Sequence, residues 1–251
     1  MKRINRALAV GVALMLAHAT PASAAELKIF GSRVTKMVVG DVGPGFEQAT
    51  GNKLNVVTDV AAVMKRRIEH GEPFDLAVLV DFQADELIRE GRLVPGSRAD
   101  VMKAGIGVAV KRGAPKPDIS TVAAFKQTLL NAKSITYLKE GASTRHLVKV
   151  LAQLGIADAL KSKTITPSTE SVSEMVAAGE AEIGIIVIPN ILSVPGAELV
   201  GPLPPEIQSW ITFTAAVSLQ SANQSAAREV IRLMQSPAGV QSIKKNGMEI
   251  P

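Results

Sequence analysis

The chain has 251 residues and a net charge of +5, with no cysteine, six phenylalanines, one tyrosine and one tryptophan. Without cysteine there is no disulfide framework, no thiolate nucleophile and no Cys-ligated zinc site. So few aromatic side chains argue against ligands that stack on aromatic platforms, which are nucleic acids and sugars. Only His70 and His146 lie beyond the first 24 residues, too few for a His-rich metal site. We therefore expect neither a metal nor a cofactor.

The first 24 residues have the pattern of a secretory signal peptide. A basic start (Lys2, Arg3 and Arg6) precedes an apolar run at 7–19, and Ala22-Ser23-Ala24 supplies small residues for cleavage. Such a run is too short for a permanent membrane anchor. We expect cleavage after Ala24, a mature chain of residues 25–251 in the periplasm, and no lipid, because no cysteine stands at the cut. Cleavage removes three positive charges, so the net charge falls from +5 to +2, which argues against a phosphate-backbone partner.

After this segment, short apolar runs alternate with amphipathic stretches. We predict strands at 27–30, 54–58 and 75–80, and helices at 34–50, 62–70 and 82–90. Gly51, Gly71 and Gly91 are the expected helix ends, and Gly40, Gly43, Pro44 and Gly45 are expected to interrupt the first helix. The nearly unbroken apolar run at 75–80 is typical of a strand covered on both faces. This order predicts an α/β fold containing parallel strands.

A second series begins near residue 105. We predict strands at 107–111, 134–138 and 183–188, an extended segment at 211–219, and helices at 121–131, 144–154, 171–178, 223–235 and 237–245. Ser171 and Glu174 have the spacing of a capping box, and Ser236 before Pro237 is an expected N-cap. We predict two α/β lobes, one from residues 25–104 plus 209–251 and one from residues 105–208. Each lobe is expected to be a mixed sheet flanked by helices, with a ligand cleft between the lobes.

Three helix starts are the candidate ligand site. In open α/β sheets ligands bind beyond the carboxyl ends of strands, where the following helices begin. Those places are Gly31-Ser32-Arg33, Asp59-Val60-Ala61 and Gly141-Ala142-Ser143-Thr144. Each start presents backbone N–H groups and the positive end of a helix dipole to an anion, and the serine and threonine hydroxyl groups add donors. The alternative is ordinary helix capping, and for Ser143 the two roles are equally weighted.

Other polar residues near these starts are candidates with an alternative each. Arg33 and Arg145 could hold carboxylates in two-point contacts, or they are solvated surface charges. His146 could move a proton near neutral pH, or it lies exposed in the first turn of its helix. Tyr137 is either a ligand donor at a strand end or a core residue, and Asn190 could reach the cleft.

Several segments in a characteristic order resemble a known family. They are ELKIF, FEQATG, KLNVV, RRIEHGEPFDLAVLVD, ELIREGRLV, GVAVKRGAPKPDIS and AAGEAEIGI. Over essentially the whole mature chain this layout resembles the type II periplasmic solute-binding proteins, in particular the molybdate-binding-protein-like group. The resemblance implies a two-lobed fold that captures a small anion in the interlobe cleft. It also implies a monomer that delivers the anion to an inner-membrane permease of the ABC type.

Two departures from that group favour an organic polycarboxylate over molybdate. Val187 stands where the family often has a tyrosine that donates to the oxyanion, and Arg33 stands where small or hydroxyl residues are usual. KRGAPKPDISTVAAFKQTL and EGASTRH are also similar to a branch that includes a periplasmic aconitate isomerase. The alternative function is therefore cis/trans-aconitate interconversion, with Tyr137 and His146 as proton carriers. No nucleophile-base pair, metal set or cofactor motif is visible, so a binding protein is the first hypothesis and the enzyme stays open.

Overall fold

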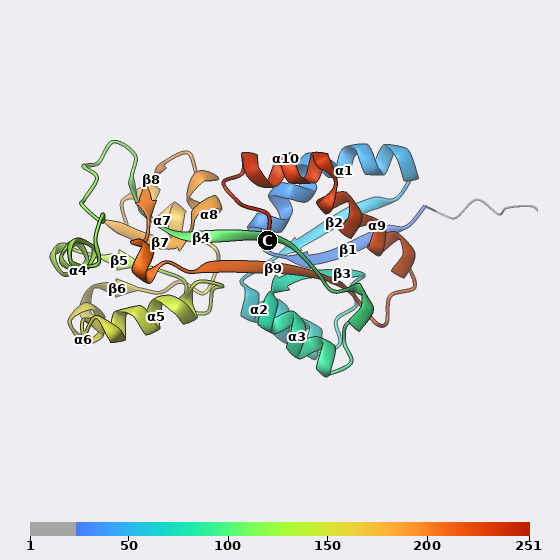
Figure 1. The fold of residues 1–251 in the computed structure, drawn as a ribbon, viewed down its shortest axis with the longest axis horizontal. Helices are drawn as coiled ribbons and strands as arrows, with labels where there is room; N and C mark the ends of the chain where they lie inside the picture. Colours follow the sequence, from blue (N-terminus) through green and yellow to red (C-terminus); the bar gives the residue numbers. More distant parts are fainter. Residues whose placement is uncertain (1–23) are drawn as a thin grey trace, which may run out of the picture.

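The computed structural model describes residues 24–251. The signal-peptide prediction therefore lies outside the described residues, apart from its last position, Ala24. Among the described residues, none of the helices combines the length and the apolar character needed to cross a membrane. The described chain folds into two α/β lobes that lie side by side, with strands β4 and β9 running between them (Figure 1).

The first lobe is a mixed sheet with helices on both faces. Its strand order is β2-β1-β3-β9-β4, in which β1 pairs in parallel with β2 and β3, and β9 runs antiparallel to β3 and β4. Helices α1, α9 and α10 pack together on one face, and α2 and α3 lie on the other (Figure 1). The bounds are β1 Glu26–Gly31, α1 Arg33–Thr50, β2 Lys53–Thr58, α2 Ala61–Glu69, β3 Leu76–Val80, α3 Asp81–Arg89, β9 Trp210–Val217, α9 Gln224–Gln235 and α10 Pro237–Lys245.

The second lobe has a smaller mixed sheet. Strand β7 is parallel to β5 and antiparallel to β4, while β8 lies antiparallel on the other side of β4. The bounds are β4 Ala99–Lys111, α4 Val122–Asn131, β5 Ile135–Thr136, α5 Thr144–Gln153, α6 Ala157–Leu160, β6 Thr164–Ile165, α7 Val172–Ala178, β7 Ile183–Val187, α8 Ile188–Leu192 and β8 Ala197–Pro202. Short 3-10 turns lie at Pro95–Ser97, Lys161–Lys163 and Pro205–Ile207.

Strand β4 belongs to both lobes. Its first part pairs with β9 up to Gly105, opposite Trp210, and its second part pairs with β7 from Ile106, opposite Val187. At this change of partner the side-chain amide of Gln208 substitutes for a strand, accepting from Ile106 N at 3.0 Å and donating to Ile106 O at 2.9 Å. The division at residues 104/105 and 208/209 remains our proposal, and this exchange of partners supports it.

Most of the predicted helices are present, but α1 differs from its prediction. It runs unbroken from Arg33 to Thr50 through the segment that was expected to interrupt it. The buried row Val34, Val38, Val42 and Phe46 packs against the sheet and α10, and this packing outweighs the hydrogen bond that Pro44 cannot donate. The helix ends at Gly51 in the left-handed region with φ of 76°, as the terminating glycine predicted.

The two predicted helix caps have different outcomes. The Ser236 side chain accepts from Gly239 N at 3.2 Å, so the N-cap of α10 is confirmed. The capping box of Ser171 and Glu174 is wrong, because the Ser171 side chain makes no cap hydrogen bond and Glu174 pairs with Arg33 of the other lobe instead. The Glu174 carboxylate, which the local pattern assigned to the start of α7, therefore forms an ion pair between the lobes.

Shorter elements were not predicted. Strand β4 begins at Ala99, eight residues before the predicted start, and the strands β6 and β8 and the helices α6 and α8 were not anticipated. The four elements that were not anticipated, β6, β8, α6 and α8, have two to six residues, which is too few for a periodic pattern to identify them.

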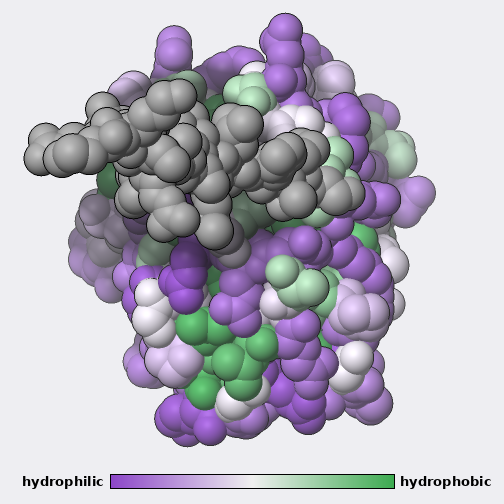
Figure 2. All heavy atoms as spheres, turned by 90° about the vertical axis from the view of Figure 1, so that its right-hand side faces the viewer, coloured by the Kyte–Doolittle hydropathy of each residue, from purple (hydrophilic) through white to green (hydrophobic). Residues whose placement is uncertain are grey.

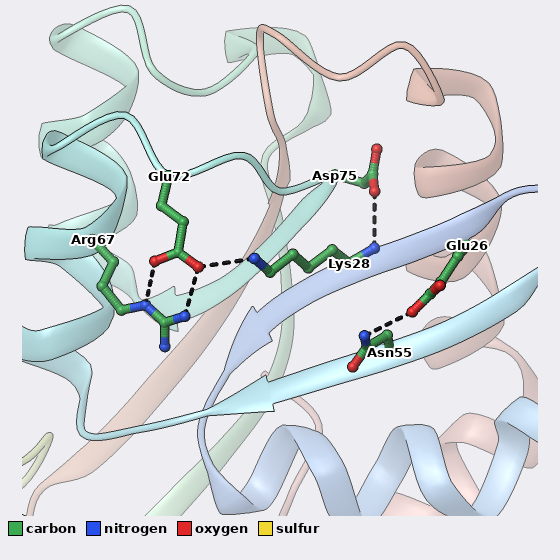
Figure 3. Close-up of polar contacts among 6 residues, drawn as sticks. All are labelled: Glu26, Lys28, Asn55, Arg67, Glu72 and Asp75. Carbon is green, nitrogen blue, oxygen red and sulfur yellow. Dashed lines mark hydrogen bonds and ion pairs between the residues drawn. The ribbon is translucent and has the colours of Figure 1, made fainter.

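Charged residues gather at the amino ends of the first-lobe strands, away from the carboxyl ends where the ligand site is expected. Lys28 Nζ and the Arg67 guanidinium both bind Glu72, and these hydrogen bonds lower the pKa of that carboxyl to about 2 (Figure 3). Figure 2 shows the outer face of this lobe. The part of this face that the described residues form is mainly hydrophilic, and it contains a group of hydrophobic residues.

Asp75 is the most buried carboxylate of this end of the sheet. Its Oδ2 accepts from Lys28 N at 2.8 Å (Figure 3), and its Oδ1 accepts from Ser221 Oγ at 2.5 Å and from Asn223 Nδ2 at 3.2 Å. It therefore ties β1 and β3 to the connection between β9 and α9. A buried donor left without its acceptor costs roughly 1–3 kcal/mol, so these hydrogen bonds stabilise the contact between segments that are far apart in sequence.

We predict that Asp75→Ala lowers the free energy of unfolding by about 2–4 kcal/mol, because it strands three donors at once. Urea unfolding followed by circular dichroism measures this. Asp158→Ala is the control, since the exposed Asp158–Lys161 pair should leave the unfolding midpoint unchanged. An Asp75→Ala protein as stable as the control variant would contradict the role given to Asp75.

Candidate functional site

A cavity lies between the lobes at the carboxyl ends of β1, β3 and β7. About 480 Å³ of space is free of protein atoms there, part of it open to solvent. Most of the lining is apolar. The lining residues are Gly31, Ser32, Val34, Val60, Ala61, Met64, Val78, Leu79, Val80, Leu138, Gly141, Ala142, Ser143, Glu170, Ile186, Val187, Asn190 and Phe213.

The structure brings the three predicted helix starts to this one cavity. Ser32 precedes α1, Val60 and Ala61 begin α2, and Ser143 is the N-cap of α5. The first N–H groups of each helix lack partners within the helix, so three positive helix ends converge from the two lobes. Val187 also lines the cavity and is 4% exposed. It stands at the position where the resembled family often has a tyrosine.

Two polar side-chain atoms in this cavity are buried and have no hydrogen-bond partner among the described residues. They are Asn190 Oδ1 and Ser32 Oγ, and Ser32 is also oriented toward Thr35 as in a capping box at the start of α1, without a side-chain cap hydrogen bond. Asn190 is 4% exposed, and the two ends of its amide are distinguished only by hydrogen bonds, so either end can face a ligand. A buried polar group without a partner costs free energy, and a bound ligand that supplies the partner recovers it.

Thr144 lies beside the cavity without lining it. Its hydroxyl group donates to Leu138 O at 2.8 Å and accepts from Gly141 N at 2.9 Å, which closes the loop before α5. The hydroxyl is therefore used to shape the loop that carries Ser143. Ser143 is buried, and its side chain makes no cap hydrogen bond.

Glu170 is the ionisable residue in the lining, and sequence reasoning missed it. It stands in the loop before α7, and its Oε2 accepts from Arg33 N, the first N–H of α1, at 3.0 Å. Burial raises the pKa of the Glu170 carboxyl to about 7, although the Arg33 N–H and charge act in the opposite direction. The only sequence signal was an acidic residue just before a predicted helix, a position more typical of capping.

Both candidate arginines are engaged at the interface of the lobes. Arg33 Nη1 pairs with Glu174 Oε1 at 2.6 Å, and its Nη2 donates to Glu170 O at 2.5 Å. The exposed Arg145 lies over the Phe82 ring, with 5.2 Å between Cζ and the ring centroid. Neither guanidinium lines the cavity, so the carboxylate clamp expected from them is absent from this arrangement.

These arginine contacts cross from one lobe to the other. Arg33 and Phe82 belong to elements of the first lobe, and Glu174 and Arg145 to elements of the second. A third contact joins Arg66 Nη1 of α2 to Glu140 Oε2, before α5, at 2.9 Å. All three hold the lobes together around the cavity.

The two candidate proton carriers lie outside the cavity. His146 Nε2 is 2.8 Å from Ile207 O, so its ring joins α5 to the turn at Pro205–Ile207. Tyr137 lines a separate hollow with residues of α5, α6 and β6. Strand β5 ends at Thr136, one residue before Tyr137. The side chain of Thr136 is buried and faces Met175, so it does not line the cavity either. Burial raises the pKa of the Tyr137 hydroxyl, which keeps it neutral.

The site has the chemistry of an anion-binding cavity built from neutral donors. No cluster of three or more metal-ligating side chains occurs within residues 24–251. Oriented N–H groups and hydroxyl groups stabilise a desolvated anion without a balancing cation, because their dipoles are fixed by the fold.

Comparison with known proteins places the chain in a family. The sequence profile described as a bacterial extracellular solute-binding protein matches residues 27–249. An aconitate isomerase from a Pseudomonas species is 32% identical, over 96% of this chain and 95% of that protein. The molybdate-binding protein ModA of Azotobacter vinelandii is 26% identical, again over 96% of this chain and 95% of that protein.

A solved structure agrees with the fold described above. The periplasmic molybdate-binding protein of Azotobacter vinelandii superimposes with a TM-score of 0.76 at 19% identity, covering 90% of this chain and 99% of that chain. With the profile match and the relatives, this two-lobed fold shows that the chain belongs to the bacterial extracellular solute-binding protein family, in its molybdate-binding-protein-like group.

Proposed function

We propose that this protein captures a small anion between its lobes in the periplasm and delivers it to an inner-membrane permease of the ABC type. The observation that carries this proposal is the convergence of three helix starts on an apolar cavity. In that cavity Ser32 Oγ and Asn190 Oδ1 are buried without partners. The family, whose relatives include a molybdate-binding protein, supports the same function. We expect the protein to act as a monomer, with closure of the lobes as the signal to the permease.

A compact oxyanion such as molybdate or sulfate fits this cavity better than a tricarboxylate. Neutral donors surround a small anion from several directions, whereas a spread-out polycarboxylate benefits from arginine forks. Arg33 and Arg145 were the sequence basis for a polycarboxylate, and both are engaged in contacts between the lobes. With the arginines occupied, the ligand proposal shifts to the compact oxyanions.

Aconitate isomerisation is the second candidate function. The Pseudomonas aconitate isomerase, 32% identical, supports it, and so does a carboxyl group with a pKa of about 7 in the cavity. The reaction breaks a C–H bond at the methylene carbon, shifts the double bond and forms a C–H bond at the former vinyl carbon. A single carboxyl group can accept and return that proton. In this arrangement Glu170 replaces Tyr137 and His146, which lie outside the cavity.

We predict that molybdate or sulfate raises the melting temperature of the mature protein, and that Asn190→Leu weakens binding about 5- to 30-fold. The substitution keeps the side-chain volume and removes a hydrogen bond worth ~1–2 kcal/mol. Titration calorimetry gives the dissociation constants, after a thermal-shift screen that also contains citrate, cis- and trans-aconitate and a sugar.

Asn131→Leu is the control for this substitution, because Asn131 is exposed at the end of α4 and does not line the cavity. It should bind as the wild type does. A screen in which only the sugar stabilises the protein would refute the anion proposal. Equal binding by wild type and Asn190→Leu would remove Asn190 from the site.

We predict no interconversion of trans- and cis-aconitate by the purified mature protein. Incubation with either isomer followed by proton NMR is the decisive assay, because it detects the other isomer directly even when one carboxyl group returns the same proton without exchange with solvent. Turnover by the wild type that disappears in Glu170→Gln would replace the binding proposal with the enzyme.

A further inference from the structure

We infer that Glu170 makes capture of the anion depend on a proton: the cavity takes up a fully ionised anion together with one proton, which resides on the Glu170 carboxyl group. This inference rests on the proposed function and adds the protonation state of the ligand-binding site. It makes Glu170 the residue that couples anion binding to uptake of a proton.

The position of the carboxyl group carries the argument. Glu170 lines the cavity together with Ser32, Ser143 and Asn190, and its Oε2 accepts from Arg33 N at 3.0 Å. This N–H group is the first of α1, the helix start best placed to bind an anion. The protein's own carboxylate therefore competes with the ligand for the same positive end of the helix.

A second observation points to a ligand in the same space. The buried Asn190 Oδ1 and Ser32 Oγ, both in the lining, have no partner among residues 24–251. Glu170 takes up one helix start and leaves these atoms unpaired, so the cavity retains binding groups that its own carboxylate does not use. An anion that reaches them lies next to Glu170.

Two negative charges in one apolar cavity are unfavourable. At contact distance two like charges repel much more strongly in such a site than in water, because the effective dielectric constant of the protein is lower. Where two acidic groups share a site, one of them takes up a proton. The anion cannot be protonated when it is the conjugate base of a strong acid, so the proton goes to Glu170, which then donates a hydrogen bond to an anion oxygen.

The groups around Glu170 fit this role. From α1, Arg33 binds the Glu170 carbonyl oxygen through Nη2 and Glu174 through Nη1, and Lys36 lines the mouth of the cleft. Asp59, after β2, and Glu174, on α7, act to raise the pKa of Glu170, and burial is the largest contribution in that direction. The mouth thus contains acidic as well as basic residues, and a displaced Glu170 carboxylate would meet Asp59 and Glu174 there.

The direction of the pH dependence follows from these contacts. Burial raises the pKa of Glu170 to about 7, and a bound anion raises it further. Below the lower of the two values Glu170 is protonated with or without ligand, and affinity does not change with pH. Between the two values the free site is ionised and binding must take up a proton, so affinity falls as pH rises, and above the higher value affinity is again constant.

The test is calorimetric titration of the mature protein with sulfate, molybdate and trans-aconitate, all of which are essentially fully ionised between about pH 7.5 and about pH 9, where the predicted change falls. We expect the dissociation constant of the anion that binds to rise roughly tenfold per pH unit above about pH 7.5. In two buffers of different ionisation enthalpy at about pH 8, we expect uptake of about one proton per anion. The latter measurement uses the wild type alone, so it does not depend on the folding of a variant.

Glu170→Gln should bind the same anion with a dissociation constant that is independent of pH, and it should bind more tightly than the wild type at the alkaline end. Glu180→Gln is the control, because Glu180 is an exposed acidic residue just after α7 and does not line the cavity. It should keep the pH dependence of the wild type.

Two outcomes overturn the inference while leaving the proposed function intact. One is anion binding by the wild type with a flat dissociation constant and no proton uptake, which means that Glu170 leaves the cavity as an anion. The other is a pH dependence that Glu170→Gln retains. Failure of all three anions to bind at any pH overturns the proposed function, and the inference with it.

Discussion

The N–H groups at a helix start that lack partners within the helix are the constraint from which the site follows. Buried N–H groups must find an acceptor, and this chain places the starts of α1, α2 and α5 around a single apolar cavity. Two carboxylates, one adjacent in sequence and one from the other lobe, satisfy part of the demand. Asp59 accepts from Val60 N at 2.8 Å, and Glu170 accepts from Arg33 N. What is left open in the cavity is Ser32, Asn190 and the remaining N–H groups, and these define an anion site without any cation in the lining.

The sheet topology explains why the starts meet. Strands β1 and β2 are parallel, so α1 and α2, the helices that follow them, begin at one edge of the first lobe's sheet. Strand β4 changes partner from β9 to β7 between Gly105 and Ile106, which brings the second sheet against that edge. Asp75 and the Lys28–Arg67–Glu72 group hold the opposite end of the strands together. Stability and binding are thus assigned to opposite ends of the same strands.

The sequence was sufficient for the elements whose signal is local. Amphipathic periods and terminating glycines predicted the long helices, and Ser236 before Pro237 predicted the cap of α10. The three helix starts were also identifiable, because each lies between a predicted strand and the predicted helix that follows it. Interactions between the lobes were not identifiable. The fork of Arg33 is used by Glu174 and by the Glu170 carbonyl, and His146 binds the Ile207 carbonyl 61 residues away in sequence.

Glu170 is a residue of the site that the sequence did not identify, and the reason is again a contact between the lobes. In the sequence it is one acidic residue in a polar loop, and nothing nearby indicates that it faces a cavity formed by the other lobe. Its burial, and with it the raised pKa, exists only when α1 and α7 are brought together. Residues whose role depends on a contact between lobes cannot be assigned from spacing alone.

The most direct test of the anion cavity is a crystal structure of the mature protein grown with molybdate, with data collected for the anomalous signal of the metal. The account predicts one strong peak between the lobes, with anion oxygens within hydrogen-bond distance of Ser32 Oγ, the Asn190 amide and N–H groups at the starts of α2 and α5. A closed protein with no peak in that cavity, or a peak bound only to surface lysines and arginines, would contradict it.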